Sequence, residues 1–60
     1  SLNKKDFETL EDKIYDFVGA DGKFGNMVAE NFGVSNLALK GLVKRSDKFC
    51  YKGLKLSRKD

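Results

Sequence analysis

The chain contains no histidine, no proline, no tryptophan and a single cysteine, Cys50. Without histidine, neither the usual zinc-ligand sets nor the Ser-His and Cys-His nucleophile pairs can be assembled. No Gly-rich phosphate-binding loop is present either. We therefore predict no metal site, no cofactor and no catalytic residue of these kinds. A lone cysteine excludes an internal disulfide and fits a reducing compartment, so we expect the protein in the cytoplasm, or in the nucleoid or nucleus.

The chain also lacks any long apolar stretch. No run approaches the roughly eighteen residues of a membrane span, and no leader resembles a signal peptide, so we expect no membrane partner. The carboxylates lie mainly on one helix that is predicted to be exposed, and 60 residues leave little room for a cleft, so we expect no enzyme. The length fits one small domain, residues 1–60. Because residue 1 is serine, we expect a processed chain or a piece of a longer protein.

Charge is unevenly distributed along the chain. Residues 1–21 hold three lysines against six acids, whereas residues 22–60 hold nine basic residues against three acids. The net charge of +3 therefore conceals a basic C-terminal part. Such asymmetry is typical of a face that binds a polyanion, although a polarised solvated surface would give the same count.

The first helix is predicted over about residues 6–18, with Asn3 or Asp6 as its N-cap. Its apolar residues fall within one arc of about 100°, which is typical of an amphipathic scaffold helix whose acidic face points outward. These residues are Phe7, Leu10, Ile14, Phe17 and Val18.

Two shorter helices are predicted after it, over about residues 25–32 and 36–45. Gly33 is a natural left-handed C-cap for the first of them, and Ser35 is a good N-cap for the second. The second of these helices turns its apolar positions inward. They are Leu39, Leu42 and Val43, with Ala38 at the edge.

The last segment alternates in the manner of a β-hairpin. Phe49 and Tyr51 share one face of a first strand, and Leu54 and Leu56 share one face of a second. Lys52-Gly53 is the expected turn, which pairs Tyr51 with Leu54 and Phe49 with Leu56. All four apolar side chains then face the helices. The opposite face shows Lys48, Cys50, Lys52, Lys55 and Ser57.

Residues 25–44, GNMVAENFGVSNLALKGLVK, resemble the helix-turn-helix signature of bacterial and phage DNA-binding proteins. That family has a small residue at the fifth position and glycine at the ninth, where this chain has Ala29 and Gly33. Its apolar positions fall on Val28, Phe32, Val34, Leu39 and Leu42. The hairpin adds a resemblance to winged-helix domains, in which two strands follow the recognition helix. The resemblance implies a mainly α-helical fold with a small β-hairpin: a three-helix helix-turn-helix core and a C-terminal two-stranded wing.

The resemblance makes residues 36–45 the recognition helix. The side opposite its apolar positions holds three cations and no acid, as entry into a major groove requires. Asn36 can bond the edge of adenine, and Leu37 can contact a thymine methyl group. The candidate DNA-binding residues here are Ser35, Asn36, Leu37, Lys40, Gly41, Lys44 and Arg45.

Each candidate has a second interpretation. Ser35 and Asn36 also fit the role of helix caps, which is the favoured role for Ser35, and Leu37 fits a protein interface or a deeper core. Gly41 costs about 1 kcal/mol in a helix relative to alanine. A close approach to DNA or to the first helix would explain why glycine stands at this position. Random drift of the sequence would explain it equally well. The three cations also fit a plain solvated surface.

The hairpin supplies a second set of candidates. Lys52, Lys55 and Arg58, together with Lys23, are placed to contact flanking phosphates, which adds affinity without sequence information. Lysines at sheet edges also prevent edge-to-edge aggregation, and the sequence does not distinguish the two roles.

The sequence thus predicts a module that binds double-stranded DNA, as part of a transcription regulator or of a phage or mobile-element DNA-binding protein. The alternative is a winged-helix protein-interaction module that uses Leu37 and the aromatic hairpin edge. Binding of RNA or single strands would require exposed aromatic residues, whereas Phe49 and Tyr51 are predicted to face the core. Tight binding is expected to need a protein partner or the remainder of a longer chain.

Overall fold

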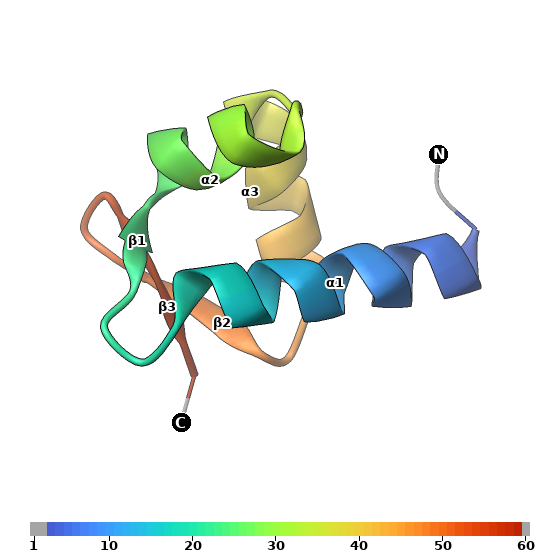
Figure 1. Cartoon of the computed structure of the whole chain (residues 1–60), viewed down its shortest axis with the longest axis horizontal. Helices are drawn as coiled ribbons and strands as arrows, with labels where there is room; N and C mark the ends of the chain where they lie inside the picture. Colours follow the sequence, from blue (N-terminus) through green and yellow to red (C-terminus); the bar gives the residue numbers. More distant parts are fainter. Residues whose placement is uncertain (1–2, 60) are drawn as a thin grey trace.

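The computed structural model describes residues 3–59 and contains three helices and three strands (Figure 1). In chain order these are α1 (Lys4–Val18), β1 (Lys23–Phe24), α2 (Gly25–Phe32), α3 (Asn36–Arg45), β2 (Phe49–Lys52) and β3 (Lys55–Arg58). The N-terminal half of α1 extends past the rest of the molecule in Figure 1, and the sheet lies beside its C-terminal half. This arrangement confirms the predicted fold class, with α2 and α3 as the helix-turn-helix.

The ends of the helices follow from local hydrogen bonds. The Asn3 side chain accepts a hydrogen bond of 2.8 Å from the Asp6 amide, so α1 begins at Lys4, two residues before the predicted start. The Ser35 hydroxyl accepts a bond of 3.1 Å from the Ala38 amide and starts α3 as predicted. Gly33 ends α2 in the left-handed conformation, at φ 66°. These caps satisfy backbone groups that a helix terminus otherwise leaves unpaired.

The core lies where the three helices and the hairpin meet. The predicted inward residues of α3 are all buried, and so are Ile14 and Val18 of the predicted apolar face of α1. Phe7, Leu10 and Phe17 are partly buried around them, whereas Ala38 is exposed. The buried apolar residues are Ile14, Val18, Val28, Ala29, Leu39, Leu42, Val43, Phe49 and Leu56.

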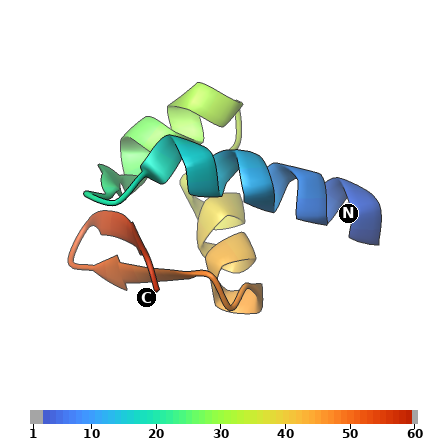
Figure 2. The same cartoon turned by 60° about the horizontal axis from the view of Figure 1, so that its bottom comes forward.

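The sheet has three antiparallel strands in the order β1-β3-β2, one more strand than predicted. β1 pairs Lys23 with Leu56 and Phe24 with Lys55. A strand of two residues is too short to show an alternating pattern, so its sequence carried no signal. The Gly25 amide extends the contact with a hydrogen bond of 3.1 Å to the Leu54 carbonyl. The tip of the hairpin is therefore joined to the start of α2. Figure 2 shows the same hairpin running back from the end of α3.

The predicted hairpin register is wrong by two residues. Tyr51 pairs with Leu56, and Lys52 pairs with Lys55, so the turn is Gly53-Leu54. Gly53 has φ 67°, and no non-glycine residue among those described has a positive φ. A two-residue turn with glycine in its first central position requires a positive φ at that position alone. The predicted turn would have placed lysine there instead, and the observed turn avoids this strain.

The observed register places one apolar residue at the surface, but it keeps the residues of the two strands on their predicted faces. Leu54, predicted to face the helices, stands in the turn and is 82% exposed. Side chains alternate with a period of two, so a shift of two residues leaves every strand residue on its predicted face. Phe49, Tyr51 and Leu56 accordingly share the inner face.

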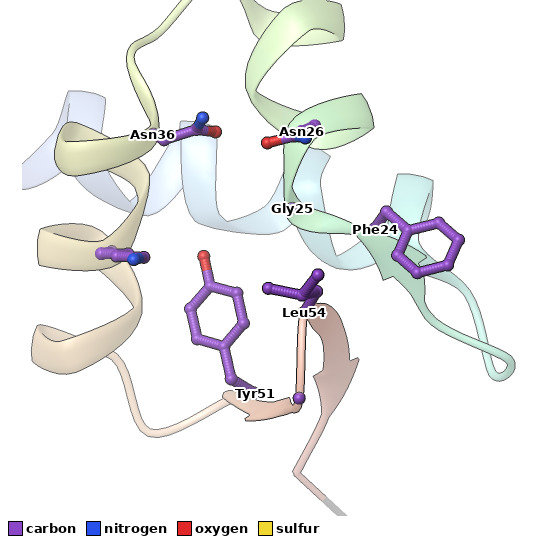
Figure 3. Close-up of a pocket in the computed structure, with 8 residues that line it drawn as sticks. Phe24, Gly25, Asn26, Asn36, Tyr51 and Leu54 are labelled. Atoms are coloured by element: carbon purple, nitrogen blue, oxygen red, sulfur yellow. The ribbon is translucent and has the colours of Figure 1, made fainter.

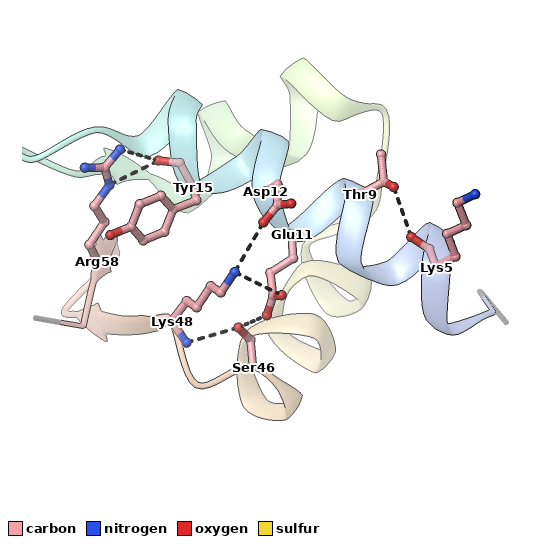
Figure 4. A network of polar contacts seen from close by, with 8 residues as sticks. All are labelled: Lys5, Thr9, Glu11, Asp12, Tyr15, Ser46, Lys48 and Arg58. Carbon is pink, nitrogen blue, oxygen red and sulfur yellow. Dashed lines mark hydrogen bonds and ion pairs between the residues drawn. The ribbon is translucent and has the colours of Figure 1, made fainter.

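One acid departs from the predicted exposed face of α1. Glu11 is only 8% exposed, and its carboxylate accepts a hydrogen bond from the Ser46 hydroxyl (Figure 4). The Lys48 ammonium lies 3.7 Å from Glu11 and 3.2 Å from Asp12. Its hydrogen bond to Asp12 raises the pKa of Lys48 above the ordinary lysine value. The cluster joins α1 to the segment between α3 and β2. The Lys48 ammonium is therefore paired with acids of the same chain.

Candidate nucleic-acid interface

The predicted recognition face of α3 is open to solvent. Leu37 is 82% exposed, and the amphipathic pattern leaves the neighbouring positions exposed as well. The helix contains no acid, and its two C-terminal cations suit the negative end of the helix dipole. The exposed residues are Asn36, Leu37, Ala38, Lys40, Gly41, Lys44 and Arg45.

The two polar residues at the start of α3, Ser35 and Asn36, differ in their hydrogen bonds. The Ser35 hydroxyl is occupied as the N-cap, which supports the capping interpretation of that residue. The Asn36 side chain, by contrast, makes no hydrogen bond to any residue from 3 to 59. Asn36 is therefore free to bind a group outside the chain.

A pocket of about 440 Å³ lies between the starts of α2 and α3 and the tip of the hairpin (Figure 3). Asn26 and Asn36 point toward each other from the two helices, and the Tyr51 hydroxyl points into the space between them. Lys40, one turn after Asn36, lines the same pocket. The two helices and the hairpin thus bring an ammonium, two amides and a hydroxyl to one opening.

Two of the predicted hairpin lysines are also exposed, and they stand directly opposite each other. Lys52 and Lys55 form the last pair of β2 and β3 before the turn. Like charges directly opposite in an antiparallel pair destabilise the sheet. A polyanion bound beside the hairpin tip would remove that repulsion.

The remaining predicted cations are engaged with the aromatic residues of α1. Arg45 lies 5.0 Å from the centre of the Phe7 ring, and Lys23 lies 5.6 Å from that of Phe17. Such contacts stabilise by about 0.5–1 kcal/mol at exposed sites. These two cations therefore lie toward α1 rather than beside the pocket.

Arg58 is the most firmly engaged of the cations. Its guanidinium lies 4.0 Å from the centre of the Tyr15 ring and donates two hydrogen bonds, of 3.2 and 2.9 Å, to the Tyr15 carbonyl (Figure 4). The residue pairs with Phe49 on the inner face of the hairpin. These contacts indicate a structural role for Arg58, which holds β3 against α1.

Gly41 has open space around it. A Cβ atom built on Gly41 meets nothing within 4 Å among the described residues, so a close approach of α1 does not explain this glycine. Gly41→Ala is expected to raise the free energy of unfolding by about 1 kcal/mol, since alanine loses less backbone entropy in a helix. Urea denaturation checks this value. A destabilised variant would contradict the open space at this position.

Sequence reasoning missed Asn26 and Tyr51 as members of the site. Tyr51 carried one usable signal, because a tyrosine at an inward hairpin position needs a partner for its hydroxyl, where phenylalanine would not. Asn26 carried only the position of a polar residue in the first turn of a helix. The meeting of both with Asn36 depends on the tertiary structure.

In the part of the chain that the structure describes, no three side chains among histidine, cysteine, aspartate and glutamate come together in a way that could hold a metal ion. Across those same residues, none of the helices is long and apolar enough to cross a membrane.

Comparison with known proteins identifies a family. A family model described as ArsR transcriptional regulator matches residues 1–60, which is the whole sequence. No curated protein and no solved structure matches the chain.

Proposed function

The chain belongs to the ArsR transcriptional regulator family, and on this premise we propose that residues 1–60 form one domain that places α3 in the major groove of duplex DNA. The exposed face of α3 carries this proposal, since it presents cations and no acid opposite the core. The family description favours a transcription regulator over an accessory protein of a phage or mobile element. It also describes regulation rather than catalysis, and we propose no enzymatic activity.

The contacts within this proposal divide by type. Asn36 and Leu37 read base edges near the start of α3, while Lys40 and Lys44 bind phosphates along the groove. Lys52 and Lys55 at the hairpin tip bind flanking phosphates. The remaining candidates are Ser35, Gly41, Arg45, Lys23 and Arg58. Of these, Ser35 caps α3, and the three cations contribute through long-range charge while they hold α1.

Fluorescence anisotropy with labelled duplex DNA over a series of salt concentrations tests the proposed function. Displacement of counterions makes log K fall linearly with log salt, by about 0.9 for each phosphate contact. A steep salt dependence supports binding to DNA. Absence of binding at low salt would reject it and favour a protein partner on Leu37, which is 82% exposed.

Asn36→Ala is expected to reduce affinity by about 1–3 kcal/mol at one preferred base pair, because a bidentate contact to a base is lost. Binding to duplexes that vary one base pair at a time measures this loss. Asn31→Ala, an exposed asparagine at the end of α2, is the matched control and should change nothing. An equal loss for every sequence would show that Asn36 does not read a base.

A further inference from the structure

The pocket between α2, α3 and the hairpin tip carries an inference that deepens the proposed function and rests on it. We propose that this pocket receives one phosphate of the DNA backbone, held by the Lys40 ammonium, the Asn26 amide and the Tyr51 hydroxyl. Asn26 and Tyr51 would then be DNA-binding residues of this chain, and α2 and the hairpin would grip the same phosphate from two sides.

The polar side chains that line the pocket are unpaired among the described residues. None of the side chains of Asn26, Asn36, Lys40 and Tyr51 takes part in a hydrogen bond or ion pair with the residues from 3 to 59. These four unpaired side chains line one opening.

The Tyr51 side chain is held in place by the start of α2. A Cβ atom built on Gly25 would lie 3.4 Å from the Tyr51 ring and 3.5 Å from its hydroxyl oxygen, so the ring packs against the start of α2. The hydrogen bond of the Gly25 amide to Leu54 fixes the hairpin tip in the same place. Burial raises the pKa of Tyr51, so its hydroxyl remains a donor at neutral pH. The hydroxyl is thus positioned before any ligand arrives.

The chemistry of the opening suits a phosphate. One ammonium with neutral amide and hydroxyl donors is a suitable set for a phosphate oxygen, since hydrogen bonds to charged groups are the stronger ones. The pocket is lined by no acid, and Lys40 brings a positive charge to its lining. A phosphodiester between α3 and the hairpin also fits the proposed entry of α3 into the groove.

Tyr51→Phe and Asn26→Ala test the proposal in anisotropy measurements with random-sequence duplex DNA. Each variant is expected to bind about tenfold more weakly to every sequence, as for loss of one hydrogen bond to a charged group. The slope of log K against log salt should stay unchanged, because neither side chain carries a charge. Tyr15→Phe is the matched control, since the Tyr15 hydroxyl lies beside Arg58 and the bonds from Arg58 go to the backbone carbonyl. It should bind as the parent does.

The outcomes separate this inference from the proposed function. Circular dichroism of both variants checks that the fold is kept, and Tyr51→Phe retains the ring that packs on Gly25. If both variants bind within twofold of the parent while Lys44→Ala weakens binding, the phosphate pocket is overturned and binding of α3 to DNA stands. If the parent protein does not bind DNA at all, both proposals are overturned.

Discussion

Replacing Lys40 and Lys44 together by alanine is expected to weaken binding to random-sequence duplex DNA roughly a hundredfold at about 0.1 M salt. Each lysine that neutralises a phosphate releases condensed counterions, and the free energy of this release contributes about a factor of ten at that salt concentration. The slope of log K against log salt should fall by about two units in the double variant. Both side chains are exposed and lie outside the core, so the fold should be retained.

The control for this prediction is Lys5→Ala combined with Lys13→Ala. These lysines lie on the exposed surface of α1, and their removal changes the net charge by the same amount. They are expected to lower affinity only slightly, through the long-range field of the protein. If the two double variants lose the same affinity, net charge alone governs binding, and α3 has no special role.

Gly22→Ala is expected to be the most destabilising of the glycine substitutions, at about 2–4 kcal/mol. Gly22 has φ 82°, a conformation that side chains rarely adopt. A Cβ atom built there would lie 2.8 Å from the Ser57 hydroxyl and 2.9 Å from the Leu56 carbonyl oxygen. The backbone carbonyl cannot move away without breaking the pairing of β3 with β1. For a chain of this length, with a total stability of about 3–9 kcal/mol, the loss is large.

Gly53→Ala separates the cost of the positive φ from the cost of the close contacts of the Cβ atom. Gly53 has a similar φ of 67°, but a Cβ atom built on it meets nothing within 4 Å among the described residues. It should therefore cost only about 1–2 kcal/mol, from the left-handed conformation alone. Urea denaturation of both variants measures the difference. Equal losses would show that the loop before β1 does not press on β3 as the structure has it.

The helices could be predicted from the sequence because their signals are local. Caps such as Ser35 and Gly33 act within three or four residues, and apolar periodicity identified the buried face of α3 correctly. The hairpin register was not settled by such signals, since both registers keep Phe49 and Tyr51 on the inner face. The position of Gly53 within the turn decided between them. No pattern in the sequence indicates the pairing of Lys23 with Leu56.

In the candidate site, too, some residues could be predicted from the sequence and others are found only in the structure. The exposed face of α3 follows from a helical wheel, so Asn36, Leu37 and Lys40 could be placed on it from sequence. The engagement of Arg58 with Tyr15 could not, because it joins residues 43 positions apart in the chain. The same holds for the pocket that joins Asn26 to Tyr51. Charge counting finds cations, but only the packing of α1 shows which of them remain available to a ligand.

The most direct test of α3 as the recognition helix is an NMR titration of the protein with a random-sequence DNA duplex at low salt, repeated at higher salt. The account predicts chemical-shift changes concentrated in residues 35–45 and 50–58 and at Asn26, all fading as salt rises. Changes confined to the acidic surface of α1, or none at low salt, would contradict binding of DNA by this face.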